Sequence, residues 1–418
     1  MAEIPAVLIL VGLAAYTVLG GADFGAGFWE LTARGKRGEA LRNHTHRSMA
    51  PVWEANHVWL IFVLVMAWTC YPEAFASIVS TLTIPLFVAG VGIILRGAAY
   101  AIRAGVRSPR EEGTVSLLFA LSSILTPFAL GLVVGGIASG RVPVGNAAGD
   151  EITSWLNGTA LLIGALAVAT SAYLAAVYLA ADARRIGDAD MESAFRARAL
   201  GAGAVAGALA LAGPFVLSSD APDLYDGLTS GLGLVALVGS AVCGVAALAL
   251  VSLRRFEPAR YVAAGAVVAI VAGWGIAQEP YILPGELTLE QAAAGDATIT
   301  AVLIGFGAGA LLLVPSLAYL FGMVLTGRFD PAAPLPPGPA VASSGEAAAR
   351  EATSLRTALL CGGVTAIGAA ITFVTGGGIA RWVGLALMLG GAVACFGAVA
   401  TLDEGEGESP PSRRAVGD

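Results

Sequence analysis

The sequence predicts an all-α polytopic membrane protein. Of its 418 residues, 57% are hydrophobic and 13% are charged, which is about half the charged share of a typical soluble domain. Long apolar runs recur along the chain without the alternation of a lipid-facing strand, so the membrane spans should be helices. The net charge of −7 resides in loops and tails. Nothing in the composition supports nucleic-acid binding.

Eleven apolar runs are long enough to cross a bilayer at about twenty residues each. Nine of them lie near residues 4–30, 54–71, 76–103, 114–138, 153–182, 197–218, 228–252, 260–278 and 297–325, and two more near 357–376 and 380–401. We therefore expect a nine-helix core over residues 1–326, followed by an extra C-terminal helix pair over 356–402. A Pro/Ala-rich segment, 327–355, reads as a flexible cytoplasmic linker, and 403–418 as a polar tail.

The charges of the connecting segments predict the orientation of the chain. Basic residues fill every second connection, and the others carry mainly aspartate and glutamate. The basic connections contain Arg34, Lys36, Arg37, Arg42, Arg47, Arg103, Arg107, Arg110, Arg184, Arg185, Arg196, Arg198, Arg254, Arg255, Arg260 and Arg328. Because basic loops stay in the cytoplasm, we expect the N-terminus outside and the C-terminus in the cytoplasm.

Small residues spaced for close helix packing are abundant. Gly131/Gly135, Gly203/Gly207 and Gly305/Gly309 each fit the GxxxG pattern. In a chain with 55 glycines such matches also arise by chance, so each pair alone is a weak signal.

Two acids lie within apolar runs. Glu54 follows Trp53 at the start of the second run, and Asp23 lies late in the first. An ionisable side chain at membrane depth costs roughly 2.5–3.5 kcal/mol, so it needs a partner or a task. For Glu54 we consider a proton relay, a buried ion pair, or an acid favoured by the N-terminus of its helix. Asp23 can be a relay group or a locally satisfied acid at a helix end.

Polar and aromatic residues accompany these acids. Arg96, near the inner end of the third run, either extends its charge to the membrane surface or pairs with Glu54 or Asp23. Asn56 and His57 form a polar cluster with Glu54, flanked by the indoles of Trp53 and Trp59. We expect the two indoles to pack against this cluster or against a partner subunit.

The histidines argue against haem binding by this chain. Only three exist, and His44 and His46 fall in the basic segment after the first run, which leaves His57 at membrane depth. Two axial imidazoles for a buried haem cannot be found. Metal-ligand spacing and nucleophile–base signatures are also missing from the sequence. We expect no catalytic, cofactor-binding or metal residues in this chain.

Two segments resemble a known family. Gly21-Ala-Asp23-Phe-Gly-Ala-Gly27, a basic segment, and then Pro51-Val-Trp53-Glu54-Ala-Asn56-His-Val-Trp59 are similar to the signature of subunit II of cytochrome bd-type quinol oxidases. Supporting pieces are Tyr71-Pro-Glu-Ala-Phe75, Leu95-Arg96 and Pro280-Tyr-Ile-Leu-Pro284. The resemblance covers about residues 1–326.

The resemblance implies a nine-helix subunit, built from two four-helix bundles plus one helix, in a bacterial cell membrane. It implies a heterodimer with a haem-bearing subunit I, which would hold haems b and d, oxidise quinol and reduce oxygen to water in aerobic respiration. This chain would stabilise that partner and supply a cytoplasmic proton path. A structural quinone or lipid held by this chain stays open.

The chain also departs from the family pattern. Gly20 stands where many members carry an acid three residues before the second aspartate, Glu54 replaces the commoner aspartate, and Ala55 stands where glycine is usual. The proline-rich linker and the last two helices have no counterpart in the short members.

The functional hypothesis is therefore a haem-free oxidase subunit with Glu54 and Asp23 as proton-transfer residues. The rival class is a proton-coupled secondary transporter, which also needs buried acids and glycine-broken helices. A transporter should repeat its polar break in both halves, whereas the cluster here is confined to the first hundred residues. A purely structural scaffold is the third reading.

Overall fold

The computed structural model describes residues 1–33, 35–103 and 109–325, together with Val364 and Leu387. The chain divides into two compact units, Met1–Thr326 and Gly327–Asp418, and every element below belongs to the first. At several residues between 35 and 55, 103 and 114, and 313 and 325 only the backbone is described. Apart from Val364 and Leu387, the linker, helix pair and tail expected over 327–355, 356–402 and 403–418 lie outside the described residues.

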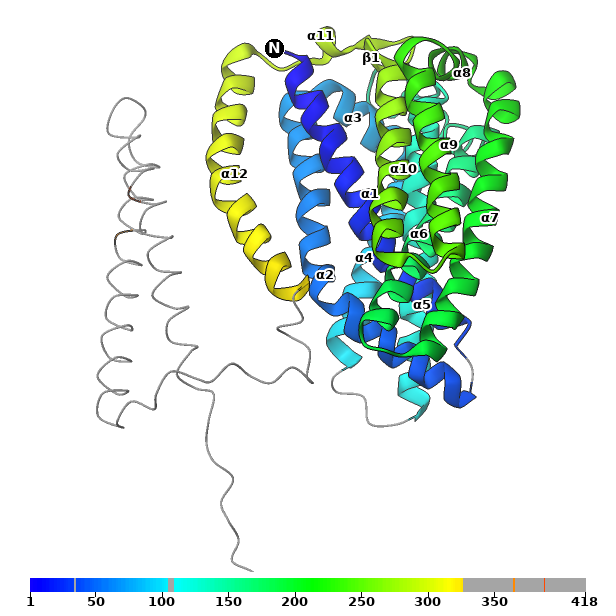
Figure 1. Cartoon of the computed structure of the whole chain (residues 1–418). Helices are drawn as coiled ribbons and strands as arrows, with labels where there is room; N and C mark the ends of the chain where they lie inside the picture. Colours follow the sequence, from blue (N-terminus) through cyan, green and yellow to red (C-terminus); the bar gives the residue numbers. More distant parts are fainter. Residues whose placement is uncertain (34, 104–108, 326–363, 365–386, 388–418) are drawn as a thin grey trace, which may run out of the picture. The chain divides into compact units, whose positions relative to one another are not determined.

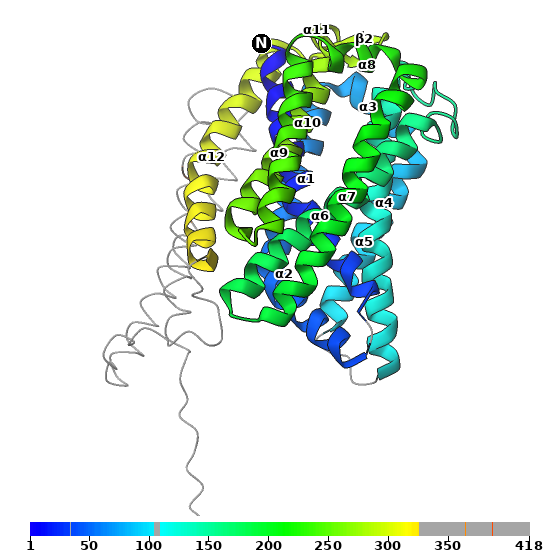
Figure 2. The same cartoon turned by 45° about the vertical axis from the view of Figure 1, so that its right-hand side comes forward.

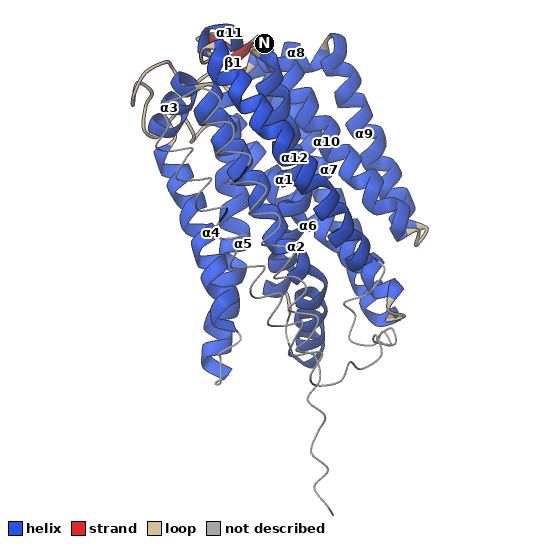
Figure 3. Cartoon of the chain, turned by 90° about the vertical axis from the view of Figure 1, so that its left-hand side faces the viewer, coloured by secondary structure: helices blue, strands red, loops and turns tan. Residues whose placement is uncertain are grey.

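Helices account for nearly all of the described elements (Figure 1). They run in the order α1 (Glu3–Leu31), α2 (Gly35–Cys70), α3 (Pro72–Thr81), α4 (Thr83–Arg103), α5 (Pro109–Ala138), α6 (Gly158–Arg185), α7 (Ala189–Asp220), α8 (Pro222–Thr229), α9 (Gly231–Ser252), α10 (Phe256–Gln278), α11 (Leu289–Ala292) and α12 (Asp296–Leu325), with strands β1 (Tyr281–Leu283) and β2 (Leu287–Thr288) before α11. The N-terminus, the strands and α11 lie at one end of the long helices (Figures 1 and 3). We call this the strand end, and the opposite end the arginine end.

The prediction of an all-α polytopic membrane protein is confirmed. Within the described residues, seven helices are long and apolar enough to cross a membrane, or eight if a bent helix pair counts as one span. A shorter apolar helix, Asp296–Leu312, covers part of the expected ninth span. The exact count of nine core spans stays a prediction.

The expectation of one unbroken span over 76–103 is wrong. Helix α3 leaves the line of α2 at a bend of 119°, and a new helix, α4, starts at Thr83. Two prolines explain the breaks, because proline has no N–H for the preceding turn. Pro72 occupies the first turn of α3, and Pro85 denies a hydrogen bond to the carbonyl of Thr81.

Other helix boundaries also differ from those expected from the sequence. Helix α2 begins at Gly35, so most of the basic segment expected as a loop is helical. Helix α6 begins at Gly158 instead of 153, because the Asn157 side chain accepts a hydrogen bond from the Ala160 amide and so caps its N-terminus. The antiparallel strands β1 and β2 and the short helices α8 and α11 carried no apolar signal and were missed.

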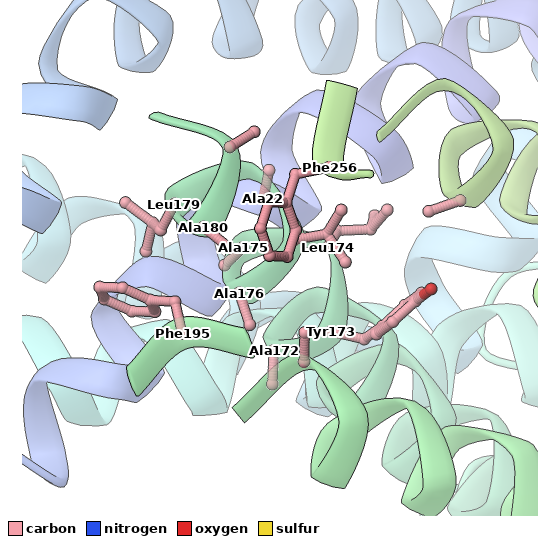
Figure 4. Close-up of a cluster of buried hydrophobic side chains, with 14 of the residues drawn as sticks. Ala22, Ala172, Tyr173, Leu174, Ala175, Ala176, Leu179, Ala180, Phe195 and Phe256 are labelled. Atoms are coloured by element: carbon pink, nitrogen blue, oxygen red, sulfur yellow. The ribbon is translucent and has the colours of Figure 1, made fainter. Parts of the chain in front are cut away.

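The helices pack as two groups. Contacts join α6 to α7, α7 to α9, α9 to α10 and α10 to α6, so these four close into a ring (Figure 2). Its core includes Leu174, Leu179, Phe195 and Phe256, with small alanines of α6 between them (Figure 4). We call α1, α2, α4 and α5 the first helix group. Its members α1 and α5 both pack extensively against α6, and α1 also contacts α10.

Helix α1 lies unusually close to α6. Gly21, Gly25 and Trp29 recur every fourth residue and so lie on one face of α1. A Cβ at Gly25 would overlap the carbonyl oxygen of Ser171, and the Trp29 indole N–H donates to the Ala172 carbonyl at 2.8 Å. This face must therefore stay free of side chains at residue 25.

The glycine pairs singled out in the sequence differ in their contacts. An added Cβ at Gly131 would lie 2.6 Å from the Gly164 Cα, and one at Gly135 would overlap Ala160, so this pair joins α5 closely to α6. An added Cβ at Gly203 would contact Leu248 and Tyr173, but no atom of the described residues lies within 4 Å of a Cβ added at Gly207, Gly305 or Gly309. Spacing alone did not distinguish these cases.

Gly25→Ala should disrupt the fold, because the methyl group would push α1 away from the α6 backbone. We expect a lower thermal stability and yield of the purified complex. The matched control is Gly207→Ala, where the open site tolerates the methyl group and the helix gains up to about 1 kcal/mol in propensity. Equal stability of the two variants would contradict close α1–α6 packing.

Candidate functional site

Asp23 lies inside helix α1, eight residues or about two turns before its end at Leu31. Its relative exposure is 1%. The reading of Asp23 as a locally satisfied acid at a helix end therefore does not hold, since the surrounding turns of α1 are helical on both sides. Its partner comes from another helix.

That partner is Arg96 of α4, which is also 1% exposed. Its Nη2 donates to Asp23 Oδ1 at 2.7 Å and its Nε donates to Oδ2 at 3.2 Å, so the contact is bidentate. Nη2 also donates to the Asp23 backbone carbonyl at 2.8 Å. A bidentate, charge-assisted contact is the arrangement that best offsets the cost of burying both charges.

The remaining faces of the Arg96 guanidinium are also satisfied. Nη1 donates to the hydroxyl of Ser123 on α5. The ring centroids of Phe119 and Phe24 lie 4.2 Å and 5.1 Å from the guanidinium carbon, and that of Tyr100 lies 6.0 Å away. Aromatic faces attract a cation, and more strongly once it is removed from bulk water, so the cage stabilises the buried Arg96.

Glycines make room for this pair. A Cβ at Gly27 would lie 3.0 Å from Arg96 Nη1 and 2.7 Å from the Ser123 Cβ. A Cβ at Gly92, one turn before Arg96 on α4, would overlap the Thr126 hydroxyl. The Gly-Ala-Asp-Phe-Gly-Ala-Gly segment thus serves both the α6 contact and the ion pair.

Of the two readings of Arg96, the structure shows pairing with Asp23. Arg96 lies seven residues before the end of α4, too deep and too enclosed for its charge to extend to the surface. The sequence did not identify Ser123 or Phe119 as members of the site, because a serine and a phenylalanine within an apolar run carry no distinguishing signal.

The second acid, Glu54, lies on α2, and its side chain and that of Trp53 lie outside the described residues. The height of its backbone follows from helix register. Helices α1 and α2 are joined by a short connection and run antiparallel (Figure 1), and an added Cβ at Gly12 would lie 2.8 Å from Phe62 and 2.9 Å from Val63. Counting eight or nine residues from this contact brings residue 54 to the height of Gly20 and Gly21.

The other residues predicted on α2 differ in their surroundings. Asn56 is buried, and neither atom of its amide has a hydrogen-bond partner in the described part of the chain. His57 and Trp59 are half-buried. The Trp59 ring packs edge-on against Phe62 at 6.4 Å, and Phe62 in turn lies 5.2 Å from Phe306 of α12. Trp59 thus belongs to an aromatic contact between α2 and α12.

A second charged cluster lies at the arginine end and was not predicted. Arg260 of α10 donates to Asp182 of α6 at 3.1 Å, and both side chains are largely buried. His44, expected in a loop, is a buried residue of α2 whose Nε2 lies 3.1 Å from the Leu179 carbonyl. Its ring packs beside Phe195 at 5.7 Å. Among the described residues, no group of three or more His, Cys, Asp or Glu side chains could hold a metal ion.

These features define a class: a multi-pass helical membrane protein with a buried, caged ion pair between its first long helix and α4. The sequence profile of the family Cytochrome bd terminal oxidase subunit II matches residues 1–324, and the chain belongs to this family. The predicted assignment to a subunit of an oxidoreductase complex is confirmed at this level.

Individual proteins similar to this chain agree with this family assignment. The putative cytochrome bd menaquinol oxidase subunit II of Bacillus subtilis is 22% identical over 327 residues, covering 74% of this chain and 91% of the relative. The cytochrome bd-I ubiquinol oxidase subunit 2 of Escherichia coli is 26% identical over 134 residues, covering 32% and 35%. The structure of bd oxidase from Geobacillus thermodenitrificans matches with a TM-score of 0.66 at 26% identity, over 78% of this chain and 98% of that chain. The transporter alternative has no support from these comparisons.

Arg96→Gln should destabilise the protein strongly, because it leaves the Asp23 carboxylate buried without its cation. The expected loss is roughly 3–5 kcal/mol. Thermal unfolding of the purified complex measures it, and the double variant Asp23→Asn/Arg96→Gln should recover part of the loss.

Glu192→Gln is the matched control, since the Glu192–Arg254 pair at 2.8 Å is partly exposed. Such pairs contribute about 0–1 kcal/mol. If Arg96→Gln lowered the stability as little as this control, the Asp23–Arg96 pair would not be a main stabilising contact of the first helix group.

Proposed function

We propose that this chain is the haem-free subunit of a quinol:oxygen oxidoreductase, which holds a haem-bearing subunit I and supplies a proton path from the cytoplasm. Haems b and d, expected in that partner subunit, would carry the electrons from quinol to oxygen. In this chain, Glu54 and Asp23 are the proposed proton-transfer residues. The family membership supports the assembly, and the site supports the path.

The observation that supports the path most is the placement of two acids at nearly one height in the membrane. Asp23 lies less than one turn from the height of residue 54, on the neighbouring helix. Each Asp23 carboxylate oxygen accepts a bond from Arg96 and keeps a further lone-pair site for water. In this proposal, protons pass between the acid on α2 and the Asp23 carboxylate on α1 through intervening water.

The proposed chemistry needs only an inward-facing route. Quinol oxidation releases its protons outside, whereas the reduction of oxygen to water consumes one proton for each electron. If those protons come from the cytoplasm through this subunit, turnover separates charge across the membrane without a pumping step. The basic residues at the arginine end support this orientation, since basic loops face the cytoplasm.

Glu54→Gln removes the exchangeable proton at residue 54 and keeps the size of the side chain. We expect oxygen consumption by the purified complex to fall by about tenfold or more at unchanged haem content, since a positioned proton-transfer group contributes roughly 10²–10⁴-fold. Glu73→Gln, at an exposed acid in the first turn of α3, is the matched control and should leave the rate unchanged.

Full activity with normal haem would remove the proposed role of Glu54. A loss of haem with unchanged activity per haem would instead favour the purely structural scaffold.

Single cysteines test the orientation. In a background without the four native cysteines, we expect a membrane-impermeant thiol reagent to label Glu286→Cys at the strand end in intact spheroplasts. Arg255→Cys, exposed at the arginine end, should react only after permeabilisation. The reverse pattern would place the N-terminus in the cytoplasm and close the proposed inward route.

A further inference from the structure

Tyr16 lies seven residues before Asp23 on α1, and therefore on nearly the same face, two turns nearer the strand end. The side chain is buried, with a relative exposure of 7%. Its hydroxyl has no hydrogen-bond partner within the described residues. Buried hydroxyls without a partner are rare in native proteins, so this one calls for an explanation.

The ring of Tyr16 extends toward the ion pair. Its edge lies 3.2 Å from the place where a Cβ on Gly20 would be, one turn further along α1. Its centroid is 6.4 Å from that of Phe24, although eight residues of helix separate their backbones by about 12 Å. The two rings therefore reach toward each other over Gly20. Phe24 is also one of the rings that contact Arg96.

Further unpartnered polar groups gather around the same place. Asn56 lies two turns before Val63 on α2, so it shares the face on which Val63 meets Gly12 of α1. By the same register, Asn56 is at the height of Val18 and Leu19, which is also the height that the Tyr16 ring spans as it extends toward Gly20. Neither atom of its amide has a hydrogen-bond partner among the residues that the structure describes.

The third such group comes from α5. Thr126 is fully buried, one turn from Ser123, and its hydroxyl also lacks a partner in the described part of the structure. It faces Gly92, one turn before Arg96 on α4. Three helices thus direct unsatisfied hydrogen-bonding groups into the region beside one ion pair. Buried polar groups of this kind are typically satisfied by ordered water, which makes about three hydrogen bonds.

We propose that the Tyr16 hydroxyl and the Asn56 amide hold ordered water beside the Asp23–Arg96 pair, and that Tyr16 is a proton carrier on the path. Only the second part of this inference, the role of Tyr16 as a proton carrier, rests on the proposed function. In each transfer the phenol oxygen accepts a proton from one neighbour and releases its own proton to the next. The phenol is unchanged afterwards, and no bond to carbon is made or broken. Glycine at residue 20 leaves space for the ring, since a Cβ there would lie 3.2 Å from its edge.

Tyr16→Phe removes the hydroxyl and keeps the ring that fills the space over Gly20. The matched control is Tyr173→Phe on α6, which removes a hydroxyl of equal exposure, also unpartnered, beside Gly203 in the other helix group. Each change deletes a hydroxyl that has no hydrogen-bond partner among the described residues, so the fold and haem content should survive in both.

In the purified complex, we expect Tyr16→Phe to lower oxygen consumption by about tenfold or more, as for loss of a proton-transfer group, and to raise the solvent deuterium isotope effect. Tyr173→Phe should change neither. Equal rates and isotope effects for the two variants would overturn the carrier role of Tyr16.

Infrared spectroscopy tests the water independently of turnover. With isotope-labelled tyrosine, the difference between the unaltered complex and Tyr16→Phe isolates the C–O stretch of this phenol. A hydrogen-bonded frequency that shifts in Asn56→Leu supports shared water, and the frequency of a free phenol overturns it. If Glu54→Gln is fully active but this band is hydrogen-bonded, the water site stands and the proposed proton path fails.

Discussion

The ion pair between Asp23 and Arg96 is the constraint on which the first helix group depends. Two charges taken out of water lose a hydration energy that attraction restores only with good geometry and further hydrogen bonds. The structure meets both conditions through the bidentate contact, the Ser123 hydroxyl and the aromatic faces of Phe24 and Phe119. Helices α1, α4 and α5 are thereby tied together at one depth.

Helix α1 meets this constraint while it packs on its other side against α6. One face carries Gly21, Gly25 and Trp29, and the α6 backbone approaches it directly. The face of α1 that carries Tyr16 and Asp23 has a different requirement, because it must hold polar side chains and leave space around them. A single segment of sequence therefore satisfies two neighbours with incompatible requirements, and this explains why it alternates glycine with an acid and large aromatic residues.

Most of the fold was predictable from the sequence, because apolar length and alternating loop charge report directly on membrane spans. The positions at which helices break were harder to predict. Pro85 was visible, but only the structure shows that the expected span over 76–103 is broken near it, whereas Pro127 and Pro214 remain within unbroken helices. Strands β1 and β2 are too short to leave a periodic signal.

For the site, a charge within an apolar run identified Asp23 and Arg96 as exceptional, and pairing was one of the stated alternatives. The choice among partners depends on which helices are neighbours, and loop charges say nothing about that. Tyr16, Ser123 and Thr126 are ordinary residues of apolar helices until their neighbours are known. In the sequence, Gly20 was notable only because many family members carry an acid at this position. In the structure, the Tyr16 ring lies against Gly20.

A neutral pair beside unsatisfied hydroxyls suits proton transfer better than an isolated acid would. The carboxylate and guanidinium together add no net charge to the membrane interior, so a passing proton is the only extra charge that the site must accommodate. Their fixed dipole orients neighbouring water, and water and a phenol each hand a proton on without becoming charged at rest. In the proposed path Asp23 keeps Arg96 as its partner, and residue 54 approaches this pair from the adjacent helix at the height of Gly20. Because the bidentate contact holds α1 against α4, the first helix group can keep one packed structure while protons pass.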